Sequence, residues 1–511
     1  MRKEIKTLLS DVLPAVDFEA DFLFSGLDSL SVATILYVLN DKYGISLGAE
    51  DVTPRNFKSL DAIVRMVQSK RCLEARIKQH AEQTPDTFAV ICGEERMTYG
   101  ELWQAILAKA EELKAGGLKP CRPYVYRNTQ DAGFLVTYCA VHYVKAIAVP
   151  LEQNASDEVF RTVTEEVEAC TFTDDIRDIL YTTGTTGKSK GVMISDTCLI
   201  SCADNFMSDL KFRAGLLFII SGPLSHIASL FKIHPTLSSG GTICVIDGLK
   251  DMKAFFKVFE MPCERFATFM VPASLRLLMQ FSYDTLCSLA DKIEFIETGA
   301  APITKADMER LAKALPKSRL YNTLGGTEIG CVSTYDFNDG RYIEGCIGRP
   351  LKNASVELSP EGNIIVSGQT IMSGYVGDPE LTKSVIIDGK IHTSDLGYFD
   401  EEGLLHLTGR VGDIINVGGY KVNPLEVETV AVTFPGVKEC VCAPAEHPVI
   451  GTVLKLFVVM EKGAILDKHA LAVHIKAKLD AYKVPTWYEE VPALRQTYNG
   501  KLDRKYYKNL K

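Results

Sequence analysis

The chain has 511 residues, a formal net charge of −9, and 46% hydrophobic and 24% charged residues. This length predicts roughly two to four domains, and the composition excludes a disordered or fibrous protein. The acidic balance argues against nucleic-acid binding, which needs a basic surface. The first fifteen residues lack the apolar run of a signal peptide, and the longest apolar stretch, residues 214–220, is too short to span a membrane. We therefore expect a soluble cytoplasmic protein with no membrane span.

The fourteen cysteines are scattered along the chain, with no Cys-x-x-Cys pair. This spacing is typical of reduced, mostly buried thiols in an intracellular protein rather than of disulfides or metal sites. The two closest cysteines, Cys440 and Cys442, alternate as neighbours on one strand would.

Residues 1–70 are predicted to form a small helical bundle. A loop ending in Gly26-Leu27-Asp28-Ser29 leads into the first clear helix, and further helices are expected at 51–57 and 59–69. Ser29 falls at a helix start, where its plainest role is that of a capping residue. The apolar residues of the helix that it begins repeat at helical spacing and are widened into a stripe by Ile35 and Val38: Leu30, Ala33, Leu36, Leu39 and Tyr43.

The sequence Gly26-Leu27-Asp28-Ser29-Leu30 in such a bundle resembles the attachment motif of acyl and peptidyl carrier domains. The resemblance covers residues 1–70. It implies that Ser29 carries a 4′-phosphopantetheine arm added by a phosphopantetheinyl transferase. A hydroxyl at a helix start suits this modification, because the positive end of the helix favours the incoming phosphate.

From residue 71 onward strands and helices alternate for several hundred residues, which predicts an α/β fold with covered sheets. A charged helix is expected at 71–83, a strand at 88–92 and another helix starting near residue 97.

The most informative segment is residues 181–191, which hold three Gly, four Thr and two Lys. Backbone N–H, hydroxyl and ammonium groups gathered in one loop are what a triphosphate needs. A Walker A loop is excluded, because it would require Gly at position 182, where this chain has Thr. The alternative is a flexible surface loop, which this composition disfavours. The predicted phosphate-binding residues are Thr182, Thr183, Gly184, Thr185, Thr186 and Lys190.

Further motifs follow in a fixed order, and together with this loop they resemble the adenylate-forming superfamily. That superfamily includes acyl-CoA ligases, aryl-acid ligases and peptide-synthetase adenylation domains. The resemblance runs from about residue 79 to the C-terminus. Taken singly, each acidic residue could belong to a turn or helix start, and the lysine to a solvated tail. The motifs are Gly299-Ala300-Ala301-Pro302, Asn322-Thr-Leu324-Gly-Gly-Thr327-Glu328, Thr393-Ser-Asp395, Gly409-Arg410-Val-Gly-Asp413 and Asn499-Gly-Lys501.

The resemblance implies an AMP-forming acid–thiol ligase that uses ATP and Mg²⁺. It also implies three parts: a carrier domain at 1–70, a large adenylation subdomain at 71–410 and a small, mobile α+β C-terminal subdomain at 411–511. For the nucleotide, the resemblance implies adenine contacts by Gly299, Ala300, Ala301 and Leu324, ribose binding by Asp395 and Arg410, and an α-phosphate contact by Thr327. It implies that Glu328 binds magnesium and that Lys501 is the catalytic lysine. It also implies a hinge at Asp413 and a pantetheine tunnel at Gly418 and Gly419.

The substrate is indicated by Gly222-Pro-Leu224-Ser-His226, which resembles the histidine motif of acyl- and aryl-activating members. His226 is accordingly a candidate catalytic residue, and a core histidine satisfied by its neighbours is an equal alternative. Amino-acid-activating members carry an Asp near this point, whereas residues 224–231 contain no acid. A buried ammonium without a carboxylate would be costly. We therefore expect a fatty or aryl acid that has no α-amino group.

Two features depart from the family pattern. Leu324 stands where an aromatic ring usually stacks on adenine, a loss of about 1 kcal/mol. In addition, only thirty residues separate Pro150 from Tyr181, which indicates a trimmed N-terminal subdomain.

The expected activity is formation of an acyl-adenylate and transfer of the acyl group to the phosphopantetheine thiol of a carrier domain, in cis or in trans. A downstream enzyme would use the thioester to make a secondary metabolite, such as a nonribosomal peptide or polyketide, or a lipid. The alternatives are an acyl-CoA ligase using free coenzyme A, an amino-acid-activating adenylation–carrier module and a non-catalytic nucleotide-binding interaction module. A connector of a few residues spans only ~10–20 Å, so loading of Ser29 by its own active site is an open question.

Overall fold

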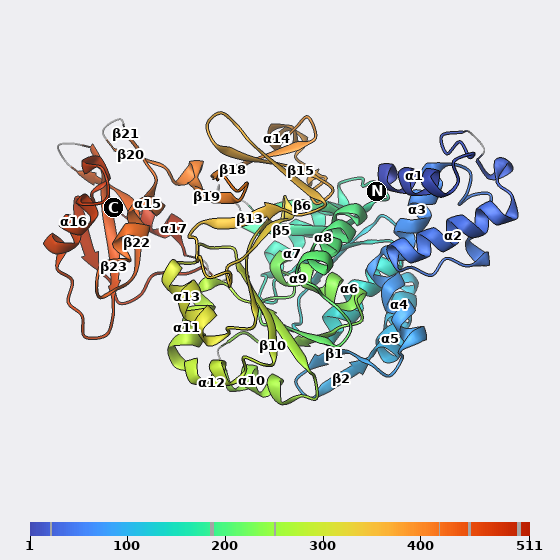
Figure 1. Cartoon of the computed structure of the whole chain (residues 1–511), viewed down its shortest axis with the longest axis horizontal. Helices are drawn as coiled ribbons and strands as arrows, with labels where there is room; N and C mark the ends of the chain where they lie inside the picture. The colour runs from blue at the N-terminus through green and yellow to red at the C-terminus, as the bar shows by residue number, and fades with distance from the viewer. Residues whose placement is uncertain are drawn as a thin grey trace. The chain divides into compact units, whose positions relative to one another are not determined.

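The computed structural model describes residues 1–20, 23–183, 189–249, 252–417, 420–447, 451–497 and 502–510. The chain divides into two compact units (Figure 1). Unit 1 contains Met1–Ile179 and Met193–Ile246, and unit 2 contains Leu180–Val192 and Asp247–Lys511. Within the described ranges, no helix is both long enough and apolar enough to cross a membrane.

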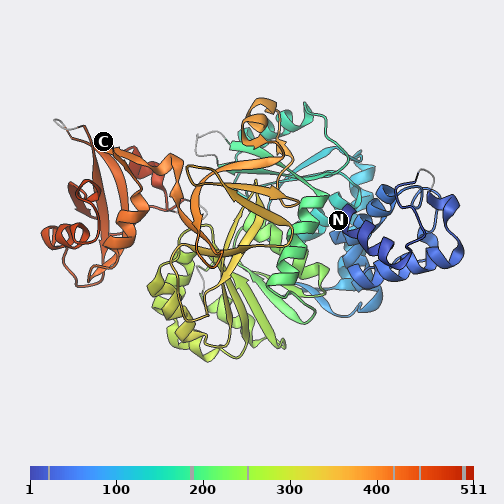
Figure 2. The ribbon, with the colours of Figure 1, turned by 45° about the horizontal axis from the view of Figure 1, so that its top comes forward.

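Unit 1 begins with the helical bundle expected from the sequence, seen as a separate group of helices in Figure 2. Its helices are α1 (Arg2–Val12), α2 (Ser29–Tyr43) and α3 (Leu60–Arg71). The N-cap of α3 is Ser59, whose hydroxyl accepts the amide of Ala62 at 3.2 Å. The bundle has its own core, in which the buried side chains include Ile5, Leu9, Phe18, Ile35, Leu39, Phe57, Ile63 and Val67.

Of the apolar stripe expected on α2, Ile35 and Leu39 are buried and Leu36 and Tyr43 pack against the bundle core, whereas Leu30 is 75% exposed. One local expectation for this bundle is wrong. The helix expected at 51–57 is replaced by a short 3-10 helix, Ala49–Asp51, followed by turns. Pro54 accounts for this, because a proline disfavours helical backbone in the residue before it.

The remainder of unit 1 is the α/β structure that the alternating pattern predicts. The strands β3, β4 and β5 pair in parallel, and a second group pairs in the order β7-β8-β1-β2. The strands are β1 (Phe88–Cys92), β2 (Glu95–Thr98), β3 (Pro123–Arg127), β4 (Ile147–Leu151), β5 (Ile176–Thr183), β7 (Leu216–Ile220) and β8 (Thr242–Val245). The helices are α4 (Leu73–Gln83), α5 (Tyr99–Ala115), α6 (Ala132–Tyr143), α7 (Asp157–Glu168), α8 (Asp196–Asp209) and α9 (Ile227–Ser238).

Unit 2 is built on a long sheet in which three parallel strands are followed by antiparallel ones. The order is β14-β15-β18-β19-β13-β12-β11-β10-β9. Its strands are β9 (Arg265–Phe269), β10 (Ile293–Gly299), β11 (Arg319–Gly326), β12 (Gly330–Asp336), β13 (Cys346–Pro350), β14 (Ala354–Leu358), β15 (Asn363–Gly368), β18 (Lys390–Phe399) and β19 (Leu405–Arg410). Other elements are β6 (Ser189–Ser195), β16 (Gly374–Tyr375), β17 (Ile386–Ile387), α10 (Met252–Lys257), α11 (Pro272–Phe281), α12 (Tyr283–Ser288), α13 (Lys305–Ala314) and α14 (Pro379–Val385).

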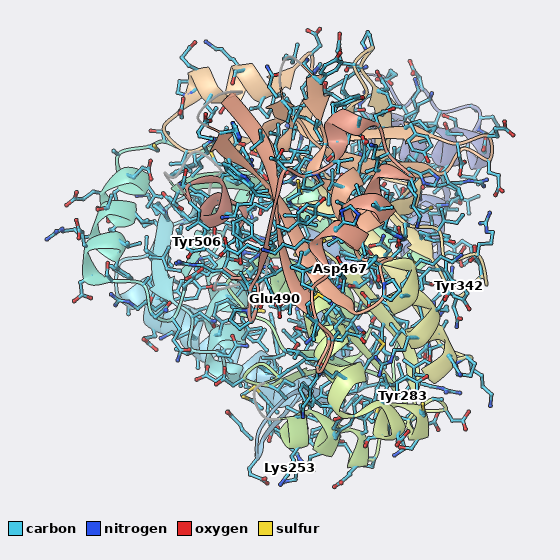
Figure 3. The ribbon with its side chains drawn as sticks, turned by 90° about the vertical axis from the view of Figure 1, so that its left-hand side faces the viewer. Lys253, Tyr283, Tyr342, Asp467, Glu490 and Tyr506 are labelled. Carbon is cyan, nitrogen blue, oxygen red and sulfur yellow. The ribbon has the colours of Figure 1, made fainter. Side chains whose placement is uncertain are left out.

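The C-terminal part of unit 2 has a sheet and core of its own. Its sheet has the order β22-β23-β24, and Cys440 and Cys442 lie buried on β22, as their alternation predicts. All fourteen cysteines of the chain are free. Figure 3 labels Asp467 at the start of α16, Glu490 at the end of β24 and Tyr506 in α17. The elements are β20 (Ile415–Val417), β21 (Tyr420–Val422), α15 (Pro424–Ala431), β22 (Val437–His447), β23 (Gly451–Met460), α16 (Lys468–Lys476), β24 (Trp487–Glu490) and α17 (Arg504–Lys508).

Candidate functional site

The turn predicted to lie along adenine follows the carboxyl end of β10. A Cβ on Gly299 would lie 2.7 Å from the carbonyl oxygen of Thr323 on the neighbouring strand, so this position accepts only glycine. The next residue, Ala300, has a φ of +65°, which an L-residue with a side chain adopts at a cost. The Gly299-Ala300 turn is therefore a tight and strained stretch of backbone, as often found at ligand sites.

The neighbouring strand, β11, carries the next predicted residues. Leu324 is buried in this strand opposite Ser333 of β12. Thr327 follows the end of β11 and is also buried. Both residues therefore belong to the same sheet edge as the Gly299 turn, because β10 and β11 are parallel and in register at Gly299 and Thr323.

Glu328 and Lys190 are brought together by a residue that sequence reasoning missed. The hydroxyl of Tyr375 donates to Glu328 Oε1 at 3.2 Å, and Lys190 Nζ lies 5.4 Å from the centre of the Tyr375 ring. The backbone supports this group, because the amide of Val376 donates to the carbonyl of Gly191 at 2.8 Å. Burial, and then the nearby Glu328 carboxylate, raise the pKa of Tyr375, so this hydroxyl remains a donor.

Asp395 and Arg410, the predicted ribose ligands, form an ion pair. They lie directly opposite each other on β18 and β19, and Arg410 Nε donates to Asp395 Oδ1 at 2.5 Å. Burial would lower the pKa of Arg410, but Asp395 outweighs that effect and raises it. The guanidinium of Arg410 therefore stays charged beside Asp395.

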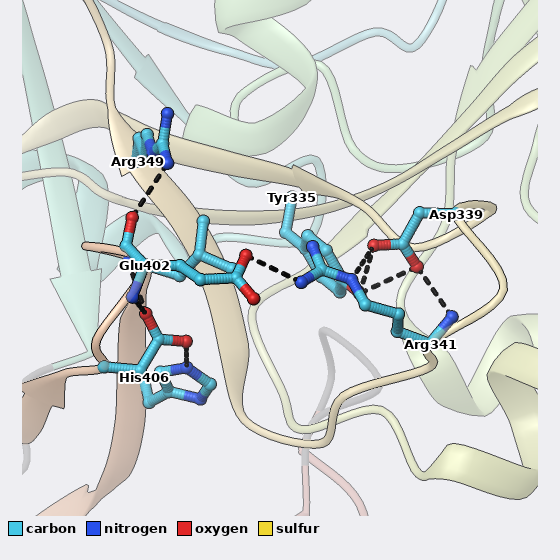
Figure 4. A network of polar contacts seen from close by, with 8 residues as sticks. Tyr335, Asp339, Arg341, Arg349, Glu402 and His406 are labelled. Atoms are coloured by element: carbon cyan, nitrogen blue, oxygen red, sulfur yellow. Dashed lines mark hydrogen bonds and ion pairs between the residues drawn. The ribbon is translucent and has the colours of Figure 1, made fainter.

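A polar network supports the far end of the same hairpin (Figure 4). Arg341, in the segment between β12 and β13, donates to Asp339 at 2.7 Å and to Glu402, in the turn between β18 and β19, at 2.8 Å. Arg349 of β13 donates to the carbonyl of Glu402 at 2.8 Å, and His406 pairs with Asp400 at 2.8 Å. These contacts fix the hairpin whose other end carries Asp395 and Arg410.

The predicted hinge residue, Asp413, is held by the last helix of the chain. Lys508 Nζ of α17 donates to Asp413 Oδ1 at 2.6 Å and to the carbonyl of Gly412 at 2.7 Å. On the same helix Arg504 makes a bidentate pair with the buried Glu428 of α15, with distances of 2.7 and 2.5 Å. Helix α17 thus connects the hinge to the core of the C-terminal part.

Several predicted residues cannot be placed on this framework. Gly184, Thr185, Thr186, Gly418, Gly419 and Lys501 lie outside the described residues, and so does the side chain of Thr183. Their roles stay predictions.

His226 belongs to unit 1 and caps helix α9. Its Nδ1 accepts the backbone amide of Ala228 at 3.2 Å. The preceding loop is held by Gln130, which donates to the carbonyl of Gly222 and accepts the amide of Leu224, both at 2.9 Å. Capping gives His226 a structural role, and its catalytic role stays a prediction.

Ser29 is not the N-cap of α2, which is the role that the sequence first suggests. The N-cap of α2 is Asp28, whose carboxylate accepts the amide of Ser31 at 2.7 Å. Ser29 is the first residue of the helix and lies exposed. Its hydroxyl is therefore placed at a helix start, where an incoming phosphate group is favoured.

No group of three or more His, Cys, Asp or Glu side chains capable of holding a metal occurs among the residues that the structure describes. The carboxylate of Glu328 fits magnesium, which is usually bound by one or two carboxylates together with substrate phosphates.

Comparison with known families matches three stretches of this chain. Residues 171–376 match the AMP-binding enzyme family, 426–501 its C-terminal domain, and 3–67 the phosphopantetheine attachment site. The chain belongs to the adenylate-forming enzymes and carries an N-terminal carrier domain. By family it is an AMP-forming acid–thiol ligase.

Individual relatives agree with this assignment. A feruloyl-CoA synthase from Amycolatopsis is 26% identical over 83% of this chain and 96% of its own length. A 2-succinylbenzoate–CoA ligase from Bacillus licheniformis is 27% identical over 84% of this chain and 98% of its own. The ATP-bound structure of MatB from Rhodopseudomonas palustris superposes with a TM-score of 0.77, at 23% identity, over 86% of this chain and 99% of MatB. That structural similarity establishes the fold alone.

Proposed function

We propose that this enzyme activates a carboxylic acid with ATP and transfers the acyl group to the phosphopantetheine thiol on Ser29. The observation that carries the proposal is the exposed Ser29 at the start of α2, on the same chain as the AMP-binding domain. A ligase using only free coenzyme A would have no need of an attachment serine.

The first step is attack of a substrate carboxylate oxygen on the α-phosphorus of ATP, with loss of pyrophosphate. Lys190 neutralises phosphate charge, Asp395 and Arg410 hold the ribose, and Lys501 stabilises the charge that develops between carboxylate and α-phosphate. Glu328 would hold a magnesium ion bound to the phosphates, and that ion would supply further charge neutralisation. Catalysis is thus positioning and charge stabilisation, without a covalent enzyme intermediate.

The second step is attack of the arm's thiol sulfur on the acyl carbon. A carbon–sulfur bond forms, the bond between the acyl carbon and the AMP oxygen breaks, and the thiol proton passes to solvent. The product is an acyl thioester on Ser29, which a downstream enzyme would consume in the synthesis of a secondary metabolite or lipid. The fourteen free cysteines suit a reducing, cytoplasmic setting.

The substrate is proposed to be a fatty or aryl acid without an α-amino group. Residues 224–231 provide no carboxylate for an ammonium, and an unpaired buried ammonium is costly. The acids in the names of the two relatives, ferulate and 2-succinylbenzoate, also lack an amino group. An amino-acid-activating module is the less favoured alternative.

Pyrophosphate exchange across a panel of fatty, aryl and amino acids, followed by intact mass of the pantetheinylated protein, tests the proposal. We expect exchange with acids that lack an amine, and an acyl mass on wild type that is missing from Ser29→Ala. Robust exchange with amino acids alone would overturn the substrate class.

An acyl-CoA ligase is the second candidate, because the relatives named above are CoA ligases. Free coenzyme A supplied to the Ser29→Ala variant distinguishes the two functions. Thioester formation that is equally fast in the wild type and in this variant, with no acyl load on wild-type Ser29, would favour the CoA ligase.

A further inference from the structure

The carrier and the ligase are joined without a linker. Helix α3 ends at Arg71 and helix α4 begins at Leu73, so Cys72 serves as the C-cap of one and the N-cap of the other. Cys72 is only 5% exposed, and its Sγ donates to the carbonyl of Ser69 at 3.1 Å. The few flexible residues that the sequence allowed between the two domains are absent from this part of the described chain.

Side chains from α3 also bind α8, a helix of the ligase. Arg71 forms an ion pair with Asp204, and its guanidinium lies 4.9 Å from the centre of the Tyr43 ring. Gln68 Nε2 donates to Thr197 Oγ1 at 3.2 Å. The Arg71 side chain is only 7% exposed, so removing its partner while the helices stay packed would leave a desolvated cation. We call these contacts, Arg71 with Asp204 and Gln68 with Thr197, the carrier seam.

The ligase also holds the helix that carries the attachment serine. Arg76 of α4 donates to the backbone carbonyls of Tyr43, at 2.7 Å, and of Gly44. These carbonyls lie at the C-terminal end of α2, where unpaired acceptors and the helix dipole favour a cation. Ser29 begins this 15-residue helix, so it lies about 21 Å along the helix axis from the end that Arg76 holds.

Helix α4 is itself fixed on the ligase. The buried Glu74 accepts from Lys145 Nζ at 2.8 Å. Burial alone would raise the pKa of Glu74, but the Lys145 ammonium outweighs it and lowers the pKa to about 2. The pair is thus ionised at neutral pH, and α4 gives the carrier a rigid base.

From these contacts we infer that the carrier stays bound to the ligase at the carrier seam while Ser29 is loaded, so that the arm moves and the domain does not. The inference rests on the proposed function, since it concerns how the thioester reaches Ser29. Attachment and loading both occur at the end of α2 remote from Arg76.

A covalent bridge across the carrier seam tests this inference. The full-length double variant Gln68→Cys, Thr197→Cys is bridged with a short bismaleimide before the arm is installed, and the bridge is verified by peptide mass. Excess reagent is quenched, and phosphopantetheine is then added to Ser29 by a transferase. The matched control is Gln68→Cys alone, treated identically, which accounts for reaction at native cysteines.

We expect bridged and control proteins to form the acyl thioester on Ser29 at the same rate. If the bridged protein forms acyl-adenylate normally but loses thioester formation by about tenfold or more, the carrier must travel and the inference is wrong. If the control forms adenylate and carries the arm, yet neither protein forms a thioester, the proposed function fails instead.

A pair of charge variants gives a second readout that does not depend on cross-linking. Arg71→Gln removes the ion pair of the carrier seam, while Arg65→Gln removes an exposed cation from the same helix. We expect faster amide hydrogen exchange in α3 for Arg71→Gln only, without faster loading of Ser29. Faster loading in Arg71→Gln than in Arg65→Gln would mean that the carrier seam restrains a domain that needs to move, and would overturn the inference.

Discussion

At residue 72 the chain passes from the carrier into the ligase through one buried residue, whereas at residues 411–414 it passes from β19 to β20 through a 3-10 turn. The first joint is covered by the carrier seam and rests on the buried Glu74–Lys145 pair. The second is held mainly by Lys508 and Asp413, whose side chains are 31% and 23% exposed.

The difference matches what each step of the proposed chemistry requires. Under the inference above, an arm on Ser29 is loaded without movement of α3. The role proposed for Lys501 in adenylate formation predicts, by contrast, that the segment carrying this residue withdraws before the thiol attacks. Partly solvated ion pairs break more readily than buried ones.

The largest effect is expected at the C-terminal side of this comparison. Lys501→Ala should lower acyl-adenylate formation by about 10²–10³-fold, because one donor to the developing charge is lost. Pyrophosphate exchange measures this rate. An unchanged rate of pyrophosphate exchange would mean that Lys501 does not take part in adenylate formation. The segment that carries it would then have no reason to move.

The pH dependence of the free energy of unfolding tests a buried polar cluster in the same unit as the first joint. His234 of α9 is buried, and its ring accepts or donates a 2.8 Å bond with the hydroxyl of Tyr138, beside Asp178 and His142. Burial, and then the nearby His142, lower the pKa of His234 to about 4. Between pH 6.5 and pH 4 the unfolded chain therefore binds a proton that the folded chain does not.

Stability should consequently fall as the pH drops through this window, by about 3 kcal/mol at most, and the contribution of His234 should level off below pH 4. Unfolding followed by hydrogen exchange in α9, for wild type and His234→Asn, measures the difference. His469→Asn, which removes an exposed histidine, is the control. Equal pH profiles for all three proteins would contradict the expectation.

Removing the ion pair of the carrier seam should have a smaller effect. Arg71→Gln is expected to destabilise the attachment of the carrier by about 2 kcal/mol, since Asp204 loses its partner but is partly solvated. Protection of α3 amides against exchange reports this change. If Arg65→Gln increased amide exchange in α3 as much as Arg71→Gln, the carrier seam would not be what holds the carrier on the ligase.

The smallest effect is expected at the second joint. Lys508→Gln should shift the ratio of adenylate formation to thioester formation by about fivefold, a free-energy change of about 1 kcal/mol for a partly exposed pair. Both half-reaction rates are measured on the same preparation. Lys505→Gln, at an exposed position of the same helix, should leave the ratio unchanged, and an equal shift in both variants would argue against a special role for Lys508.

The sequence predicted those features that depend on local pattern. The helix expected at 59–69, the α/β alternation and the helix start at Ser29 all follow from neighbouring residues. The pairing of Asp395 with Arg410 depends on sheet register, and the contact of Tyr375 with Glu328 joins residues far apart in the chain. The one available signal for Tyr375 was its place in Ser373-Gly-Tyr-Val-Gly377, a short glycine-bracketed motif.

Whether the connector at Cys72 is buried could not be predicted from the sequence, for a different reason. The sequence predicts a boundary between residues 70 and 71, but a buried connector and a mobile one differ only in what packs around Cys72. That packing comes from α4 and α8, whose contacts with α3 are tertiary. The exposure of Leu30 in the apolar stripe of α2 was missed for a similar reason, because only the neighbouring helices select which of its residues, Ile35 and Leu39, become buried.

The single-residue connector also bears on protein engineering. A domain joined through a flexible linker can be exchanged by cutting within that linker, and this chain has none between α3 and α4. A substitute carrier would have to end its last helix in register with Cys72, supply an arginine for Asp204 and present backbone carbonyls to Arg76. A useful chimera would therefore keep residues 68–76 and replace the bundle around them.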